Sequence, residues 1–232
     1  MDTFGRMLLR ALIASALATA ALAAPAAAAT TLAPLKPCYA SDGPGPDKRE
    51  SISIHATGFT PEAFVDLQID GQTLDTTRAD AFGAVVGAIP APFQGAAGGG
   101  ERAFSVTVVE QGNPANFATL GSRVTNLAVT LRPNPARPSR KVRFRCRGFT
   151  KPNAAVFAHY VFGGVLQKTV RLVERPIGPC GVFSVKRRQI PVADARVGDW
   201  RLQIDQQRKW VERPASNMQA MTIRVREVFL EP

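Results

Sequence analysis

The sequence predicts an all-β protein built from two tandem immunoglobulin-like (Ig-like) β-sandwich domains. Three observations lead to this prediction. Apolar and polar residues alternate with a period of two in many short stretches, which is typical of strands with one buried face. Gly-containing turns separate these stretches at intervals of about ten residues. The outline of one stretch also recurs later in the chain, and helix signals are nearly absent throughout.

The recurrence is an internal duplication. Residues 58–60 read Gly-Phe-Thr, and the same triplet recurs at residues 148–150, which lie 90 positions later. Each triplet follows an alternating run and precedes an apolar run that ends in glycine. A period of about 90 residues fits two small β domains better than the units of about 20 to 50 residues found in solenoids and propellers.

The N-terminal segment is predicted to direct export. Residues 1–29 contain Arg6 and Arg10, a short apolar run and small residues at alternate positions, which is the pattern of a cleaved signal peptide. The alternative is a membrane anchor, but Arg10 interrupts the run, and a spanning helix needs about 20 apolar residues. We therefore expect a secreted or cell-envelope protein with no membrane span after cleavage. Residues 30–49 are rich in Pro and Gly and are predicted to be an irregular linker.

The first Ig-like domain is predicted over residues 50–132. Ile52, Ile54 and Ala56 alternate with polar residues, so they should face a core. A second alternating run ends at Asp70 and Gly71, where glycine supplies the positive φ of a hairpin turn. Further strands are expected within residues 81–86, 104–108 and 124–131.

A proline-rich segment, residues 133–139, is predicted to link the two domains because proline cannot donate to a sheet ladder. The second Ig-like domain then covers residues 140–232. Trp200 alternates with charged neighbours and should lie in its core. Strands are expected within residues 142–146, 156–162, 170–172, 182–185, 200–204 and 223–228.

The two parts of the chain differ in net charge. The formal net charge is +11, but residues 30–136 carry seven Lys or Arg against ten Asp or Glu, whereas residues 137–232 carry twenty against seven. The second domain should therefore bind anionic surfaces in a salt-dependent manner. The alternative is a solvated face in an arginine-rich protein. The predicted anion-binding residues are Arg143, Arg145, Arg147, Lys186, Arg187 and Arg188.

The chain has three cysteines, which in an exported protein suggest one disulfide and one remaining thiol. Cys146 and Cys180 are 34 positions apart within the second domain, and we expect them to pair. Closing a loop of that size stabilises a domain by about 3 to 4 kcal/mol in the chain-entropy model. Cys38 would then stay free, pair between chains or compete with one of the other two.

The sequence shows no pattern typical of a catalytic or metal site. His55 and His159 are the only histidines, and neither is near a nucleophile elbow. The cysteines and histidines lack the spacing of a zinc site, and the acidic residues lack that of a calcium loop. We expect no enzyme activity, no cofactor and no metal. A deep pocket that gathers His159 with an acid and a hydroxyl would favour an enzyme instead.

Two segments resemble known bacterial proteins. Residues 58–86 read GFTPEAFVDLQIDG followed by ADAFGAVVG, which resembles the Ig-like modules of secreted and cell-surface actinobacterial proteins. Residues 158–210 include AHYVFGGVLQKTVRL, GPCGVFSVKRRQIP and WRLQIDQQRKW, and are similar to exported actinobacterial proteins of uncharacterised activity. Together these segments cover about a third of the chain. The resemblance implies tandem Ig-like domains and export, and it implies no particular activity.

These observations lead to one functional hypothesis and one alternative. The second domain is predicted to dock electrostatically on an anionic cell-envelope polymer. The first domain is predicted to act as a spacer or to present the second domain. Nucleic acid is not expected as a specific partner, because an exported protein does not share a compartment with the genome. The alternative is an extracellular protein-binding module, an adhesin or inhibitor, that uses loops at one end of a sandwich.

Overall fold

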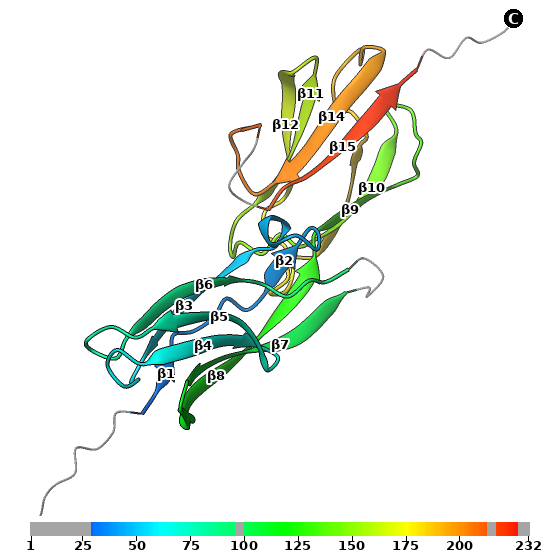
Figure 1. Cartoon of the computed structure of the whole chain (residues 1–232). Helices are drawn as coiled ribbons and strands as arrows, with labels where there is room; N and C mark the ends of the chain where they lie inside the picture. The colour runs from blue at the N-terminus through cyan, green and yellow to red at the C-terminus, as the bar shows by residue number, and fades with distance from the viewer. Residues whose placement is uncertain (1–28, 96–99, 213–216, 227–232) are drawn as a thin grey trace, which may run out of the picture.

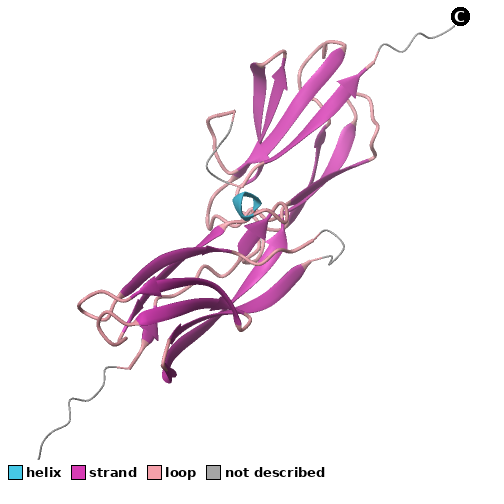
Figure 2. Ribbon diagram, viewed as in Figure 1, coloured by secondary structure: helices cyan, strands magenta, loops and turns pink. Residues whose placement is uncertain are grey.

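The computed structural model describes residues 29–95, 100–212 and 217–226, so residues 1–28 of the predicted signal peptide lie outside the described residues. The described chain is almost entirely β-structure, with a single 3-10 turn, η1 (Pro46–Lys48), which confirms the predicted fold class (Figures 1 and 2). The strands are β1 (Thr31–Leu32), β2 (Tyr39–Ser41), β3 (Ser51–Thr57), β4 (Phe64–Ile69), β5 (Gln72–Arg78), β6 (Val85–Pro90), β7 (Glu101–Glu110), β8 (Asn113–Asn126), β9 (Ala128–Arg132), β10 (Lys141–Arg147), β11 (Val156–Phe162), β12 (Val165–Val173), β13 (Phe183–Arg188), β14 (Gly198–Asp205) and β15 (Gln219–Val225).

The first unit is a sandwich of two sheets (Figure 1). One sheet has the strand order β1-β3-β6, and the other has the order β2-β8-β7-β4-β5. Neighbouring strands are antiparallel except for β2, which pairs with β8 in parallel. The alternation predicted for β3 is present, since Ile52, Ile54 and Ala56 are buried in the core between the sheets.

The second unit repeats this plan with seven strands. Its sheets have the orders β13-β10-β9 and β12-β11-β14-β15, an arrangement of three and four strands that is typical of Ig-like domains. Trp200 is buried in its core, as predicted, and the tilted ring of Phe162 packs against it with the ring centroids 5.0 Å apart. The two units have separate hydrophobic cores.

The duplicated Gly-Phe-Thr triplets occupy equivalent places in the two units. Gly58 and Gly148 both follow the second strand of a three-stranded sheet, with φ angles of 93° and 88°. The next residue in each copy, Phe59 or Phe149, is buried in the core of its unit. Residues other than glycine rarely adopt a positive φ. The glycine thus allows the turn that directs the aromatic ring inward.

Replacing Gly181 by alanine should destabilise the second unit by at least about 2 kcal/mol. Gly181 has a φ of 62°, and a Cβ atom there would overlap the carbonyl oxygen of Phe149. Gly163 has a φ of 56° and no atom within 4 Å of the same position, so Gly163→Ala measures the conformational cost alone. Urea denaturation of both variants checks this prediction, and equal losses of stability would contradict it.

The structure corrects the predicted domain boundaries. Residues 128–132 form β9, which pairs with β10, so they belong to the second unit and not to the first. The proline-rich segment 133–139 connects two strands of one sheet, and the chain passes between the units at Leu127. Residues 30–49 are not an irregular linker, because they contain β1 and β2 of the first sandwich. Alternation identifies a strand, but it does not reveal the partner with which that strand pairs.

A candidate anion-binding face and the domain junction

Strand β10 presents a row of cationic side chains to the solvent. Val142, Phe144 and Cys146 are buried, and the residues between them point to the opposite face of the sheet. Lys141, Arg143 and Arg145 are all exposed. This arrangement agrees with the alternation predicted from the sequence.

The neighbouring strands add further positive charges to the same face. Arg143 lies directly opposite Arg132 on β9 and Lys186 on β13. Adjacent strands are about 4.8 Å apart, so these three cations form one row across the sheet. One step along, Lys141 lies opposite Arg188. We call this surface the basic face, and it comprises Arg132, Lys141, Arg143, Arg145, Lys186 and Arg188.

Two of the predicted anion-binding residues lie apart from the centre of this face. Arg147 is half-buried near the first unit, where its Nη1 atom donates to Asn126 Oδ1 at 3.5 Å. Arg187 is paired with the buried residue Val142, and its Nη2 atom donates to the Leu172 carbonyl in the other sheet at 3.4 Å. The sequence prediction also missed Arg132, because that residue was assigned to the first domain.

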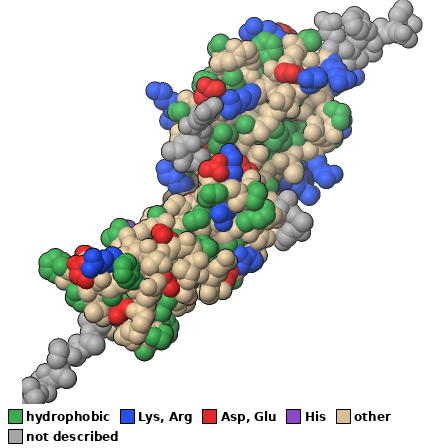
Figure 3. Space-filling model, viewed as in Figure 1, with side chains coloured by type: hydrophobic (Ala, Val, Ile, Leu, Met, Phe, Trp, Pro, Cys, Tyr) green, Lys and Arg blue, Asp and Glu red, His purple; other side chains and the backbone are tan. Residues whose placement is uncertain are grey.

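The cations of the basic face have no acidic partners in the described part of the chain. The ion pairs found there within 4.0 Å involve other residues. Most of the Lys and Arg side chains visible in Figure 3 lie over the second unit. Like charges that face each other across strands are destabilising, so a bound anion would relieve their repulsion.

A cavity of about 630 Å³ lies at the end of the basic face that is closest to the first unit. Arg132 and Arg145 line it together with Glu101 of the first unit. Ile177 and Val182 add an apolar wall, and both are well exposed to solvent. A ligand on the basic face can therefore contact both units.

The disulfide joins the two units and differs from the predicted pairing. Cys38 pairs with Cys180, and their Cα atoms are 5.1 Å apart across a separation of 142 residues. Cys146 is free and buried, because the alternation of β10 directs its side chain into the core. Burial raises the pKa of the Cys146 thiol to about 12, so the thiol stays protonated at neutral pH. The predicted pairing relied on distance along the chain, which does not determine distance in space.

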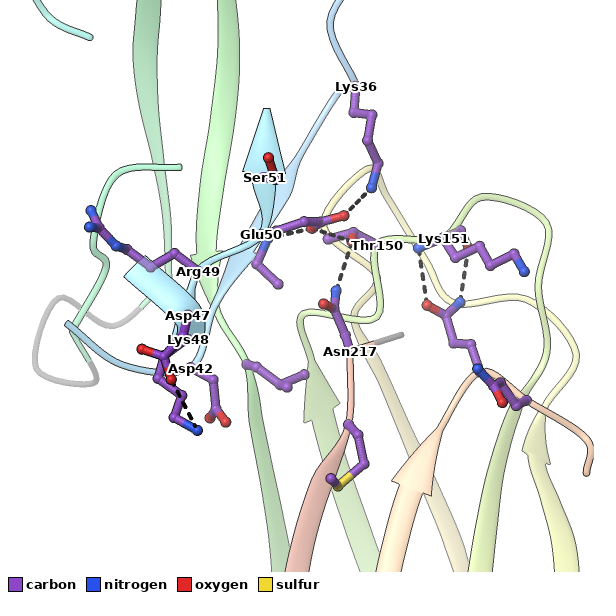
Figure 4. Close-up of a pocket in the computed structure, with 15 residues that line it drawn as sticks. Lys36, Asp42, Asp47, Lys48, Arg49, Glu50, Ser51, Thr150, Lys151 and Asn217 are labelled. Carbon is purple, nitrogen blue, oxygen red and sulfur yellow. Dashed lines mark hydrogen bonds and ion pairs between the residues drawn. The ribbon is translucent and has the colours of Figure 1, made fainter. Parts of the chain in front are cut away.

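A second connection between the units centres on the Glu50 carboxylate (Figure 4). It pairs with Lys36, and it accepts hydrogen bonds from the Ala40 backbone N–H at 2.9 Å and the Thr150 hydroxyl at 3.0 Å. The Asn217 side-chain amide donates to the same hydroxyl oxygen at 2.9 Å. Glu50 therefore joins Lys36 and β2 to the second unit.

The junction also contains a cavity of about 690 Å³ beside Glu50. Its walls carry both signs of charge, including Asp42, Lys36 and Lys151. Burial raises the pKa of Asp42, although the positive charge of Lys48 opposes this shift. Because neither sign of charge dominates, this cavity is a weaker candidate for polyanion binding than the basic face.

His159 is part of a buried polar network that the sequence did not predict. Its Nε2 atom lies 3.3 Å from Asp205 Oδ1 and 3.1 Å from the Gln207 carbonyl oxygen, while Nδ1 lies 3.0 Å from Thr169 Oγ1. Both partners of Nε2 are acceptors, so this nitrogen carries a proton. An acid, an imidazole and a hydroxyl therefore meet, but the His159 and Asp205 side chains are fully buried, which leaves a substrate no access to them.

The environment of Asp205 keeps its carboxylate ionised. Burial alone would raise the pKa of this group, but hydrogen bonds from His159, from the Gln203 side chain and from the Gln207 backbone outweigh burial and lower it. Gln203 Nε2 donates to Asp205 Oδ2 at 2.8 Å, and the Gln207 N–H donates to Oδ1 at 2.8 Å. These donors replace the hydrogen bonds to water that the buried carboxylate loses on folding.

The described residues contain neither a metal-binding cluster nor a membrane-spanning helix. His55, the other histidine, lies on β3 with its side chain exposed. Among the described residues, no group of three His, Cys, Asp or Glu side chains is placed to hold a metal ion. Nor does that part of the chain contain a helix long and apolar enough to cross a membrane.

Comparisons with known proteins add little to this description. No protein-family model and no curated protein matches the chain. The CupB2 chaperone of Pseudomonas aeruginosa is 10% identical with a TM-score of 0.28, over 84% of this chain and 100% of the chaperone chain. Latent PorU of Porphyromonas gingivalis is 16% identical with a TM-score of 0.28, over 87% of this chain and 21% of its own. A bacterial ice-binding adhesin is 14% identical with a TM-score of 0.27, over 83% and 62% of the two chains. Similarities this low carry no functional argument.

Proposed function

We propose that the protein is an exported, non-enzymatic binding protein that docks electrostatically on an anionic polymer of the cell envelope. The observation that carries this proposal is the row of Arg132, Arg143 and Lys186 across three strands, which has no acidic partner in the described chain. A repeating anion would neutralise several of these charges at once and release counterions, which makes binding favourable at low salt.

Two further observations support the proposal. The excess of positive charge lies in residues 137–232. The first unit is slightly acidic, so it can act as a spacer between the basic face and another surface. The Cys38–Cys180 disulfide is compatible with the oxidising environment outside the cytoplasm. The disulfide and the Glu50 contacts also connect the two units.

Charge reversal on the basic face should abolish retention on the envelope. The variant Arg143→Glu, Arg145→Glu and Lys186→Glu should bind isolated envelope at least about 100-fold more weakly, because three attractive contacts become repulsive. Co-sedimentation at several salt concentrations measures this effect.

The matched control reverses three cations outside the basic face. Arg78 and Arg102 lie in the first unit and Lys168 lies on β12, so their change to Glu alters net charge equally without touching the basic face. The control should retain most of its binding. Unchanged retention of the first variant, or equal losses in both, would refute docking through the basic face.

One observation favours the alternative function, an extracellular protein-binding module. Phe82, in the turn between β5 and β6, is 91% exposed, and Phe64, the first residue of β4, is 56% exposed. This turn lies at the end of the first unit that is remote from the second (Figure 1). Exposed aromatic side chains at sandwich-end loops are suited to a protein partner. Envelope retention that survives high salt and is lost in Phe82→Ser would favour this alternative.

A further inference from the structure

The spacing and chemistry of the basic face indicate a particular class of polyanion. We infer that the ligand is an extended phosphodiester polymer that runs along β10 and is recognised through its backbone alone. This inference rests on the proposed function, because it assumes that the basic face binds a polyanion. It specifies in addition the spacing of phosphates in the ligand and the direction in which the ligand lies on the sheet.

The cations of β10 repeat at the spacing of the phosphates in an extended polymer. Lys141, Arg143 and Arg145 occupy alternate positions of β10, so successive side chains on this face are six backbone bonds and about 7 Å apart. Successive phosphorus atoms in a glycerol-phosphate or sugar-phosphate chain are also separated by six bonds. An extended polymer of this kind therefore places one phosphate beside each cation of the strand. In an extended two-fold polyuronate, by contrast, successive carboxylates point to opposite sides. Carboxylates on the same side of that polymer are therefore two sugar rings apart.

Cationic and hydroxyl side chains lie side by side across the sheet. Arg145 lies between two hydroxyl residues, with Thr130 opposite it on β9 and Ser184 opposite it on β13. One step along β10, Arg143 lies between Arg132 and Lys186. Guanidinium groups bind phosphate oxygens in a bidentate manner, and hydroxyl groups donate to the oxygens that remain. Each row thus offers several donors to one tetrahedral anion.

The basic face, all of whose residues lie in the described chain, carries no aromatic side chain. Phe144 of β10 and Phe183 of β13 both point into the core. Proteins that bind single-stranded nucleic acid stack the bases on aromatic side chains, and this face offers no such platform. We therefore expect a nucleic-acid strand and a polyol phosphate to bind through the same backbone chemistry, without a contribution from bases.

Two synthetic oligomers with equal numbers of phosphates test the repeat. Propanediol phosphate has six bonds between phosphorus atoms, as in the proposed ligand, whereas hexanediol phosphate has nine. The full-length mature protein should bind the propanediol oligomer at least about tenfold more tightly. Its affinity should fall with salt with a log–log slope of about −2, as about three phosphate contacts predict. Equal affinities and equal slopes for the two oligomers would overturn the match of repeats.

Two variants test whether the oligomer binds along β10. Arg143→Gln should make the slope for the propanediol oligomer shallower by about 0.7, which is one contact with a single strand. Lys168→Gln removes an exposed cation from β12 in the other sheet of the same unit, and it should leave the slope unchanged. A similar change in both variants would contradict binding along β10.

Further probes test whether the phosphodiester backbone alone is recognised. An abasic oligodeoxyribonucleotide and an oligothymidylate of equal length should bind equally, and tighter binding of the oligothymidylate would show that bases are read and would overturn the inference. Polygalacturonate with the same number of charges should bind more weakly, and equal or tighter binding would likewise overturn it. If no polyanion binds at low salt, the proposed function itself fails. These outcomes distinguish failure of the inference from failure of the proposal.

Discussion

Serine at both Cys38 and Cys180 should lower the free energy of unfolding of the whole chain by up to about 5 kcal/mol. The disulfide closes a loop of 142 residues, and in the chain-entropy model the loss on removing a disulfide increases with loop length. Because the two cores are separate, we also expect the variant to unfold in two steps. Urea denaturation measures both effects. Tryptophan fluorescence reports only the second unit, which contains Trp200 and Trp210, while circular dichroism reports both units.

The control for this prediction is Cys146→Ser. Cys146 is buried and free, so its replacement should leave the link between the units intact and cost much less stability. Proteolysis without reducing agent should yield a Cys38 peptide joined to a Cys180 peptide. A peptide that joins Cys146 to Cys180 would contradict the pairing, as would a double variant as stable as the parent.

Replacing Asp205 by alanine should destabilise the second unit by about 3 kcal/mol or more. The carboxylate is fully buried and accepts hydrogen bonds from His159, from the Gln203 side chain and from the Gln207 backbone. Alanine leaves the Gln207 N–H without this acceptor and opens a space between the other donors. Guanidinium denaturation followed by tryptophan fluorescence provides the measurement.

The matched control is Asp199→Ala in the same strand, β14. Asp199 forms an exposed pair with Arg224, in which Arg224 Nε lies 2.6 Å from Asp199 Oδ1. Exposed ion pairs contribute little because water screens them, so this variant should unfold at nearly the parent denaturant concentration. Comparable destabilisation by the two replacements would show that the buried network has no special role in stability.

The lowered pKa of Asp205 also predicts a pH dependence. A carboxyl group whose pKa is lower in the folded state contributes its full stabilisation above its unfolded pKa, which is about 3.9 for Asp. That contribution is lost as the pH falls from about 4 through the lower folded pKa. Asp205→Asn cannot titrate, so the stability difference between parent and variant should shrink as the pH is lowered through this range. A difference that stays constant would contradict the assigned pKa shift.

The sequence by itself determined the features that depend on a single strand. The period-two pattern of β3 and β10 identified their buried and exposed faces, because side chains alternate across any strand whatever its partner. The turn at Asp70 and Gly71 was recognisable because both residues tolerate a positive φ, which they have in the structure. By contrast, the nearly fully exposed strand β5 has no apolar alternation and was not predicted.

Only the tertiary structure decided which segments meet. The pairing of β9 with β10 moved the domain boundary to Leu127 and brought Arg132 beside Arg143. Folding placed Cys38 against Cys180, and His159 against Asp205, across long separations in sequence. Strand pairing, disulfide partners and buried networks all depend on contacts between distant segments. A local pattern reports which face of a strand is buried, but it carries no information on what lies against that face.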